Sequence, residues 1–347
     1  MSRSIIVNTR ALAHRLTGVE RYTCELTSRL KGKIDPVRPA FKSGGVLGHV
    51  WEQVVLPRNV GSRDILWSPA NTGPLRVSNQ VLTIHDLSPL EHPEWFTPSF
   101  AAWYSFLIPR LVNRIRLVLT VSEFSKSRIV ELLKISEDKV VVVQPGVDAG
   151  KFHPQAGAQQ SISNRSAPLP ERYILFVGAL EPRKNLSRLV RAWEQLQSLP
   201  RIAQAGIELV LAGSPGIPFR SVETEHWPKG VHMLGYIEDC DLPALYAGAL
   251  AFILPSLYEG FGLPVLEAMA CGVPVLASKN TALAETAATA AVLFDPFSVN
   301  DIAEALFAVI EDGKLRQTMC FKGLERVQAF SWERAAGKVL EVIHGCV

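Results

Sequence analysis

Residues 259–267 constrain the fold of this 347-residue chain more than any other stretch, and they read Glu-Gly-Phe-Gly-Leu-Pro-Val-Leu-Glu. An apolar run precedes them at residues 251–254, and a second one follows at residues 273–277. Pro264 stands where the first turn of a helix tolerates proline, and Gly272 stands where a helix favours glycine at its C-terminal end. The pattern therefore predicts a strand, a glycine-rich loop, a helix and a second strand, as in an α/β protein.

This loop combines groups that suit phosphate with groups that suit sugars. Gly260 and Gly262 let the backbone approach a ligand closely, and the following helix directs its free amides and its positive dipole end at the loop. Glu259 and Glu267 repel phosphate but accept charge-assisted hydrogen bonds from hydroxyl groups. Together these features favour a nucleotide-sugar pocket, and a plain turn of an α/β protein is the alternative.

A second loop carries two adjacent cations. Residues 173–177 predict a strand and residues 186–199 an amphipathic helix, and the loop between them ends on Arg183, Lys184 and Asn185. A helix dipole disfavours cations at this end, so an anion is expected between the two cations and the helix. A guanidinium and an ammonium together neutralise a diphosphate well. The alternative is a solvated helix start.

The first half predicts a parallel sheet covered on both faces, because its strands are short and continuously apolar. These strands are expected at residues 5–7, 64–67, 81–84, 117–121 and 140–143, and further strands in the second half at residues 207–211, 231–234, 251–254, 273–277 and 291–294. His85 directly follows one strand, where α/β sheets bind their ligands, although a lone histidine is equally often a structural group. Ser122 follows another strand and is expected to cap a helix.

Charge, cysteines and missing motifs narrow the function. The net charge of +3 is too small to indicate nucleic-acid binding, although Lys and Arg outnumber Asp and Glu in residues 1–150. The five cysteines are scattered without a Cys-x-x-Cys pair, and neither a secretory signal nor a transmembrane segment is recognisable. We therefore expect a cytoplasmic protein with reduced thiols. The sequence contains no P-loop, no Gly-x-Gly-x-x-Gly fingerprint and no clustered metal ligands.

Residues 100–116 interleave aromatic and aliphatic side chains with Arg110, Arg114 and Arg116. Such a segment can lie in a membrane interface with its arginines toward anionic lipid, which would give peripheral contact with the cytoplasmic face of the inner membrane. An ordinary core helix interrupted by Pro109 explains the apolar residues equally well.

The two loops, in this order and spacing, resemble those of the retaining GT-B glycosyltransferases of family 4. The resemblance rests on Gly178 with Arg183-Lys184-Asn185 and on residues 259–275, and it extends to Leu234-Gly235-Tyr236. In the first half it includes residues 18–22, 85–86, 121–125 and 145–148. The details at Gly18 and at His85-Asp86 are most similar to bacterial mannosyltransferases of O-antigen and exopolysaccharide assembly.

The resemblance implies two Rossmann-like domains that face a cleft. Residues 1–155 would form an N-terminal acceptor-binding domain, and residues 171–330 would form the nucleotide-sugar-binding domain. The segment 156–170 is small, polar and bounded by prolines, which is typical of a linker. A helix within residues 331–347 would return to the N-terminal domain.

The resemblance also implies roles for single residues. Arg183 and Lys184 would hold the donor diphosphate, Glu259 would hold the transferred sugar, and His85 would contact that sugar from the opposite domain. Glu267 would bind the ribose hydroxyls. The remaining donor contacts would come from Gly178, Gly235, Tyr236, Gly260, Phe261, Gly262 and Leu263. Many relatives carry a Gly-Gly pair in the first glycine loop, whereas in this chain the close approach of the backbone to the donor phosphate would rest on Gly18 alone. The resemblance further implies that no metal or other cofactor is required.

The expected reaction moves a hexose, mannose from GDP-mannose, to a lipid-linked or oligosaccharide acceptor with retention at the anomeric carbon. Its expected place is the synthesis of a bacterial surface polysaccharide. Other donors stay open, namely GDP-rhamnose, dTDP-rhamnose or a UDP-hexose. A GT-B sugar-nucleotide epimerase and a non-catalytic sugar-nucleotide-binding protein are the further alternatives.

Overall fold

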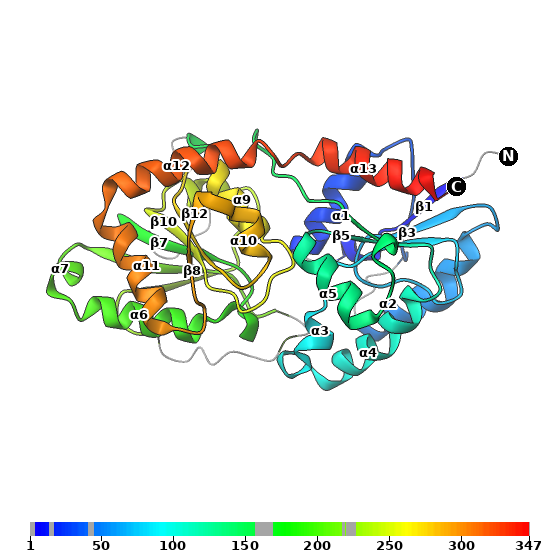
Figure 1. Ribbon diagram of the computed structural model, residues 1–347, viewed down its shortest axis with the longest axis horizontal. Coiled ribbons are helices and arrows are strands. Elements are labelled where there is room, and N and C mark those ends of the chain that lie inside the picture. Colours follow the sequence, from blue (N-terminus) through cyan, green and yellow to red (C-terminus); the bar gives the residue numbers. More distant parts are fainter. Residues whose placement is uncertain are drawn as a thin grey trace. The chain divides into compact units, whose positions relative to one another are not determined.

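The computed structural model describes residues 4–13, 17–40, 45–156, 169–216, 219 and 227–346. The chain forms two compact units (Figure 1). The first consists of Met1–Pro93, Pro98–Gly146 and Ser331–Val347, and the second of Glu94–Thr97 and Val147–Phe330.

The division between the units differs from the expected boundary at residue 155. It falls after Gly146, because Phe152 is buried in the second unit with its ring edge-on to that of Tyr246. The expected linker at residues 156–170 lies, apart from its ends, outside the described residues.

The first unit is built on a six-stranded sheet in the order β2-β1-β3-β4-β5-β6. All neighbouring strands pair in parallel. The strands are β1 (Ile5–Asn8), β2 (Asp35–Val37), β3 (Ile65–Ser68), β4 (Gln80–Thr83), β5 (Leu117–Thr120) and β6 (Val140–Val142). The strand order reverses between β1 and β3, which makes this point the topological switch of the sheet.

Helices surround this sheet (Figure 1). They are α1 (Gly18–Arg29), α2 (Gly45–Val50), α3 (Ser88–Glu91), α4 (Pro98–Val112), α5 (Glu123–Leu133) and α13 (Trp332–Gly345), with a π-helix at Trp51–Val55. Ser122 caps α5 as expected, since its hydroxyl accepts a hydrogen bond from the Ser125 amide. Helix α13 lies against α1 (Figure 1), where buried Trp332 meets the ring of Tyr22.

The segment 100–116 contributes mainly to the core. Tyr104, Ile108 and Leu111 of α4 are buried in one cluster with residues of β4 and β5. Phe106 is the exception and lies 46% exposed. In the part of the chain that the structure describes, no helix is long and apolar enough to cross a membrane.

The second unit contains a six-stranded parallel sheet in the order β12-β11-β10-β7-β8-β9. The strands are β7 (Arg172–Val177), β8 (Ile207–Ala212), β9 (Val231–Gly235), β10 (Ala251–Leu254), β11 (Val275–Ser278) and β12 (Ala291–Phe294). Counted from the first strand of the unit, this is the Rossmann order 3-2-1-4-5-6. The switch point therefore lies between β7 and β10.

The helices of this unit are α6 (Leu186–Gln197), α7 (Pro200–Ala203), α8 (Leu242–Ala247), α9 (Leu263–Ala270), α10 (Ala282–Ala287), α11 (Val299–Glu311) and α12 (Gly313–Val327). Helices α6 and α11 lie side by side, as do α9 and α12 (Figure 1). Strands β7, β10 and β11 are almost entirely buried, which agrees with the apolar runs that predicted them.

Candidate active site

The two loops predicted to bind the donor follow the two strands that flank the switch point of the second sheet. The loop after β7 ends in a 3₁₀ turn over Pro182–Lys184, and the loop after β10 leads into α9. Because parallel strands end at the same edge of a sheet, β7 and β10 bring these loops together. The Leu257 amide donates a hydrogen bond of 2.7 Å to the Arg183 carbonyl and ties one loop to the other.

Asn185 anchors the loop that carries Arg183 and Lys184. It adopts a left-handed conformation with φ of 61°, which asparagine tolerates better than most residues. Its buried side-chain amide donates to the carbonyl of Pro255 at 3.1 Å and to that of Pro296 at 2.7 Å. The turn that carries Arg183 and Lys184 is thereby anchored to the loops after β10 and β12.

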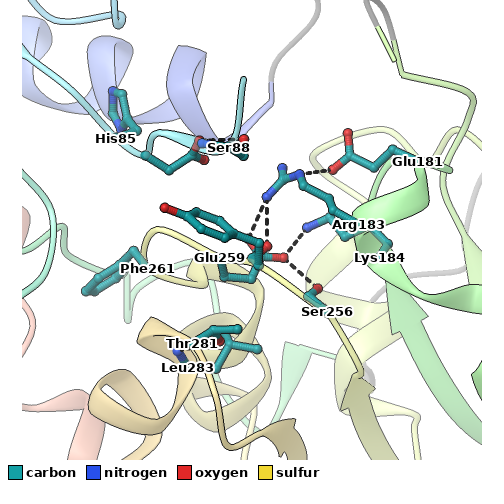
Figure 2. Close-up of polar contacts among 12 residues, drawn as sticks. His85, Ser88, Glu181, Arg183, Lys184, Ser256, Glu259, Phe261, Thr281 and Leu283 are labelled. Carbon is teal, nitrogen blue, oxygen red and sulfur yellow. Dashed lines mark hydrogen bonds and ion pairs between the residues drawn. The ribbon is translucent and has the colours of Figure 1, made fainter. Parts of the chain in front are cut away.

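Four charged side chains form a cluster in these loops (Figure 2), in which Glu181, Lys184 and Glu259 are buried and the Arg183 side chain is 16% exposed. Nη1 of Arg183 lies 3.1 Å from Oε2 of Glu259, and Nζ of Lys184 lies 2.5 Å from Oε1 of the same carboxylate. The Ser256 hydroxyl donates to Oε1 of Glu259 at 2.7 Å. On its other side, Arg183 places Nε 2.6 Å from Oε1 of Glu181.

This cluster is electrically balanced, with two cations and two carboxylates. Burial alone would raise the pKa of Glu259, but the charges of Lys184 and Arg183, with hydrogen bonds from Lys184 and Ser256, hold it at about 2. The carboxylate is therefore ionised at neutral pH. Sequence reasoning separated the cations for phosphate from Glu259 for the sugar, whereas the structure joins all three.

The glycine loop positions the start of α9. Gly262 adopts a φ of +99°, and a Cβ there would approach Cδ2 of Leu283 to 2.3 Å. Glycine is thus required on both steric and conformational grounds. The Phe261 side chain packs into the interior against Phe330, and its carbonyl accepts a hydrogen bond of 2.6 Å from Thr286. Any ligand contact of Phe261 must consequently come from its backbone.

Glu267 lies on α9, with its side chain only 5% exposed. Its Oε2 accepts a hydrogen bond of 3.0 Å from the hydroxyl of Tyr246 on α8. The contact between Glu267 and the ribose hydroxyls of the donor stays a prediction.

The other predicted donor residues of this unit lie at the ends of β7, β9 and β10. Gly235 ends β9 with φ of +70°, and Tyr236 follows it with 39% of its surface exposed. Gly178 directly follows β7, where an added Cβ would approach Phe176 to 3.1 Å. Gly260 lies within the loop after β10, and Leu263 is the first residue of α9.

His85 and Gly18 belong to the first unit. His85 follows β4, where Nε2 lies 2.8 Å from the Pro69 carbonyl and Tyr22 packs edge-on to the imidazole at 4.8 Å between centroids. Because a carbonyl only accepts, Nε2 must carry the proton when the ring is neutral. Burial lowers the pKa of His85, partly opposed by the Pro69 carbonyl and the charge of Asp86, so the neutral form is favoured. Gly18 is the first residue of α1, and Thr17 before it forms a capping box with Glu20.

Sequence reasoning missed several residues that shape this site. Glu181 and Ser256 touch the charged cluster, Asn185 anchors it, and Tyr246 binds Glu267. Glu181 and Asn185 lie within two residues of Arg183 in the sequence, and this proximity could have identified them as residues of the site. Tyr246 ends the segment 241–246, which also resembles the family, whereas Ser256 gave no signal.

No cluster of three or more His, Cys, Asp or Glu suited to a metal ion occurs among the residues that the structure describes. The expectation that no metal is required stays a prediction.

Comparison with known proteins identifies the family. A model described as glycosyl transferases group 1 matches residues 159–324, and one described as glycosyltransferase family 4 matches residues 66–151. O-antigen chain mannosyltransferase B of Escherichia coli is 30% identical, over 97% of this chain and 98% of that protein. The chain belongs to the family 4 glycosyltransferases.

Other relatives of this glycosyltransferase include longer proteins. Serotype-specific mannosyltransferase WbdA of Escherichia coli is 28% identical over 79% of this chain, which spans only 34% of WbdA. Among solved structures, sucrose-phosphate synthase from Thermosynechococcus elongatus superposes with a TM-score of 0.77 at 20% identity, covering 99% of both chains. Anabaena HepE in complex with UDP-glucose superposes with a TM-score of 0.75 at 17% identity, covering 99% of this chain and 100% of that one. These structures confirm the GT-B fold. The family models and the mannosyltransferase relative show that the protein is a hexosyltransferase.

Proposed function

We propose that this glycosyltransferase moves mannose from GDP-mannose to a hydroxyl of a lipid-linked or oligosaccharide acceptor, with retention at the anomeric carbon. The observation that carries the proposal is the 30% identity to an O-antigen chain mannosyltransferase across nearly both whole chains. The proposed setting is the synthesis of a bacterial surface polysaccharide, on the cytoplasmic side of the membrane.

The charged cluster supports the chemistry. As the bond to the sugar breaks, negative charge grows on the departing diphosphate, and Arg183 and Lys184 are already fixed in place to stabilise it. The N-terminal end of α9 adds amides and a positive dipole end. These groups would supply the charge that a metal ion supplies in other transferases, so the proposed reaction requires no metal. The leaving phosphate would take the acceptor proton, and we assign no general base.

The remaining assignments follow the family. Glu267 would bind the ribose and His85 the transferred sugar, while the backbone near Gly235 and Tyr236 would flank the base. Glu259 would exchange one of its cation contacts for a sugar hydroxyl when the donor binds, because both of its oxygens are occupied by Lys184, Ser256 and Arg183.

The donor class is tested by thermal unfolding with a panel of sugar nucleotides, since a ligand that binds the native state raises the melting temperature. A shift with GDP-mannose that is absent with UDP and dTDP sugars supports the proposal. A UDP-hexose donor is the second candidate, because HepE, with the same fold, was solved with UDP-glucose. Anomeric NMR of the fresh product distinguishes retention from inversion, and nucleotide release that an acceptor accelerates distinguishes a transferase from an epimerase.

Contact with an anionic membrane surface is proposed through α2 and α4. Trp103 of α4 donates a hydrogen bond of 3.2 Å to His49 of α2, so the two helices are neighbours. Val46 and Leu47 of α2 are 78% and 65% exposed, and the Arg110 guanidinium lies over the ring of exposed Phe106. Binding to vesicles that contain anionic lipid should weaken when Arg110, Arg114 and Arg116 are replaced together by alanine. Unchanged binding refutes the arginine contribution.

A further inference from the structure

A second ion pair, between Arg10 and the buried carboxylate of Glu52, lies in the first unit, and it also lies at a topological switch point. Asn8 ends β1 and Arg10 follows it, while Thr72 follows β3. Strands β1 and β3 are the two neighbours between which the order of this sheet reverses. In open α/β sheets, ligands bind outside the carboxyl ends of the strands at this point.

Glu52 lies at the centre of this cluster. It is carried by the π-helix Trp51–Val55 and is 1% exposed. Its Oε1 accepts a hydrogen bond of 2.7 Å from the Asn8 amide and one of 3.1 Å from the Thr72 hydroxyl. Single-turn π-helices occur frequently at functional sites.

Arg10 is held beside this carboxylate. Its Nε lies 3.4 Å from Oε1 of Glu52, and its Nη2 donates to the Thr72 hydroxyl at 3.1 Å. Burial alone would raise the pKa of Glu52, but the charge of Arg10 and further contacts with His49 and Thr72 lower it overall. Glu52 is therefore ionised, and the pair carries no net charge.

The Arg10 guanidinium is partly open to solvent, with 13% of its side chain exposed. Within the described ranges, its Nη1 has no hydrogen-bond partner. The hydrogen bond from Nη2 to Thr72 and the charge of Glu52 beside Nε hold the other edge of the guanidinium, so this Nη1 points in a defined direction. An ion pair with a buried carboxylate is weak support for stability by itself, and its position at a switch point points to a role in ligand binding.

We propose that Arg10 is an acceptor-binding residue that donates hydrogen bonds to oxygen atoms of an uncharged saccharide, with Glu52 and Thr72 as its positioning residues. The proposal rests on the proposed function, because it concerns the acceptor of that reaction. The acceptor oxygens are those of a neutral sugar, since the carboxylate of Glu52 cancels the charge that would attract a phosphate. The second unit also pairs an arginine with a glutamate at its switch point, Arg183 with Glu259, but there Lys184 and the N-terminal end of α9 add the positive charge that a diphosphate needs.

The test separates transfer to an acceptor from transfer to water. Nucleotide release from the donor that the wild type uses is measured alone and with methyl α-mannoside or mannose 6-phosphate as the acceptor. The variants are Arg10→Ala, Arg10→Lys and Glu52→Gln, with Arg58→Ala as the control because Arg58 is an exposed arginine of the same unit. If the wild type releases no nucleotide from any sugar nucleotide, the proposed function fails before Arg10 is tested.

We expect methyl α-mannoside to accelerate release by the wild type and by Arg58→Ala. Arg10→Ala should raise the KM for this sugar about tenfold or more, the effect of losing a charged donor, while release without acceptor and the KM for the donor stay unchanged. Arg10→Lys keeps the charge but loses the planar guanidinium, so its KM for methyl α-mannoside should lie between those of the wild type and Arg10→Ala. This variant tests the proposal if Arg10→Ala does not fold. Glu52→Gln leaves Arg10 without its counter-charge and should shift preference toward mannose 6-phosphate.

Three results would overturn the inference. They are an unchanged acceptor KM in a folded Arg10 variant, an equal fall in release with and without acceptor, and a wild type that responds only to the phosphorylated sugar.

Discussion

Arg183 and Glu259 lie 76 residues apart and meet through Nη1 and Oε2 at 3.1 Å, at the point where the strand order of the second sheet reverses. The cation proposed to hold a diphosphate is thus already paired with the carboxylate proposed to hold the sugar. Binding of the donor must redistribute these contacts without leaving a charge unpaired, and the first three predictions concern the groups that take part.

Replacement of either cation by alanine should lower kcat by about two to three orders of magnitude, because each removes a fixed positive charge that stabilises the leaving diphosphate. Nucleotide release at saturating donor measures the effect. Arg201→Ala, an exposed arginine in α7, is the control. Near-normal turnover by Arg183→Ala would refute a transition-state role.

Glu259→Gln should destabilise the second unit by about 3–5 kcal/mol, since it leaves buried Lys184 and partly buried Arg183 without their shared carboxylate. An anion then replaces the lost charge. Inorganic pyrophosphate should therefore raise the melting temperature of this variant more than that of the wild type. Equal shifts in both proteins would show that the carboxylate does not balance these cations.

Glu181→Gln should separate binding from turnover. Glu181 is 1% exposed and forms an ion pair with Nε of Arg183. The neutral glutamine would hold Arg183 less firmly, but it would also remove a negative charge from the proposed diphosphate site. We expect kcat to fall at least about tenfold while a nucleoside diphosphate binds as tightly as before, or more tightly. Glu194→Gln, on the exposed face of α6, should change neither quantity. A parallel loss of affinity and turnover would assign Glu181 a merely structural role.

Stability of the first unit should fall as the pH drops below about 6.5, the ordinary pKa of histidine. Burial lowers the pKa of His85 in the folded state, so the unfolded chain takes up this proton first. The stability that neutral His85 contributes is fully present above the histidine pKa of the unfolded chain. It is lost as the pH falls from there through the lower pKa of the folded protein. The melting temperature should fall more between pH 7.5 and pH 5.5 for the wild type than for His85→Gln. Parallel curves would mean that His85 is not held neutral.

Gly262→Ala should destabilise the protein by about 1–3 kcal/mol, through the strained φ of +99° and the clash with Leu283. Gly337→Ala is the matched control, because this helical glycine on α13 has open space around it and should gain about 0.5–1 kcal/mol. Opposite changes in melting temperature are expected. A neutral Gly262→Ala would show that the loop can move away from α10.

The strands were predictable because buried parallel strands are continuous apolar runs. β7, β8 and β10 lie within a residue or so of their expected positions. β2 was missed because Asp35, Pro36 and Val37 form a short, mostly exposed strand that carries no apolar signal. Its place beside β1 depends on pairing, which a single sequence does not encode locally.

The chemistry of the site was predictable only in part. Sequence order identified the types of residue in two loops, and the structure confirms that these loops are adjacent. Which groups pair depends on the Rossmann strand order, which places β7 next to β10 across residues far apart in the chain. The Arg10–Glu52 pair was missed for the same reason, since a glutamate between Trp51 and Gln53 reads as an ordinary surface residue.

The position of α13 has a consequence for synthesis of the protein. Trp332 covers Tyr22, which in turn packs against His85, and Gly146 lies so close to the start of α13 that no side chain would fit there. The first unit therefore stays incomplete on the ribosome until residues 331–346 have been translated. The unit encoded later in the gene can finish folding first, and a nascent chain halted before α13 would expose an unfinished surface to chaperones.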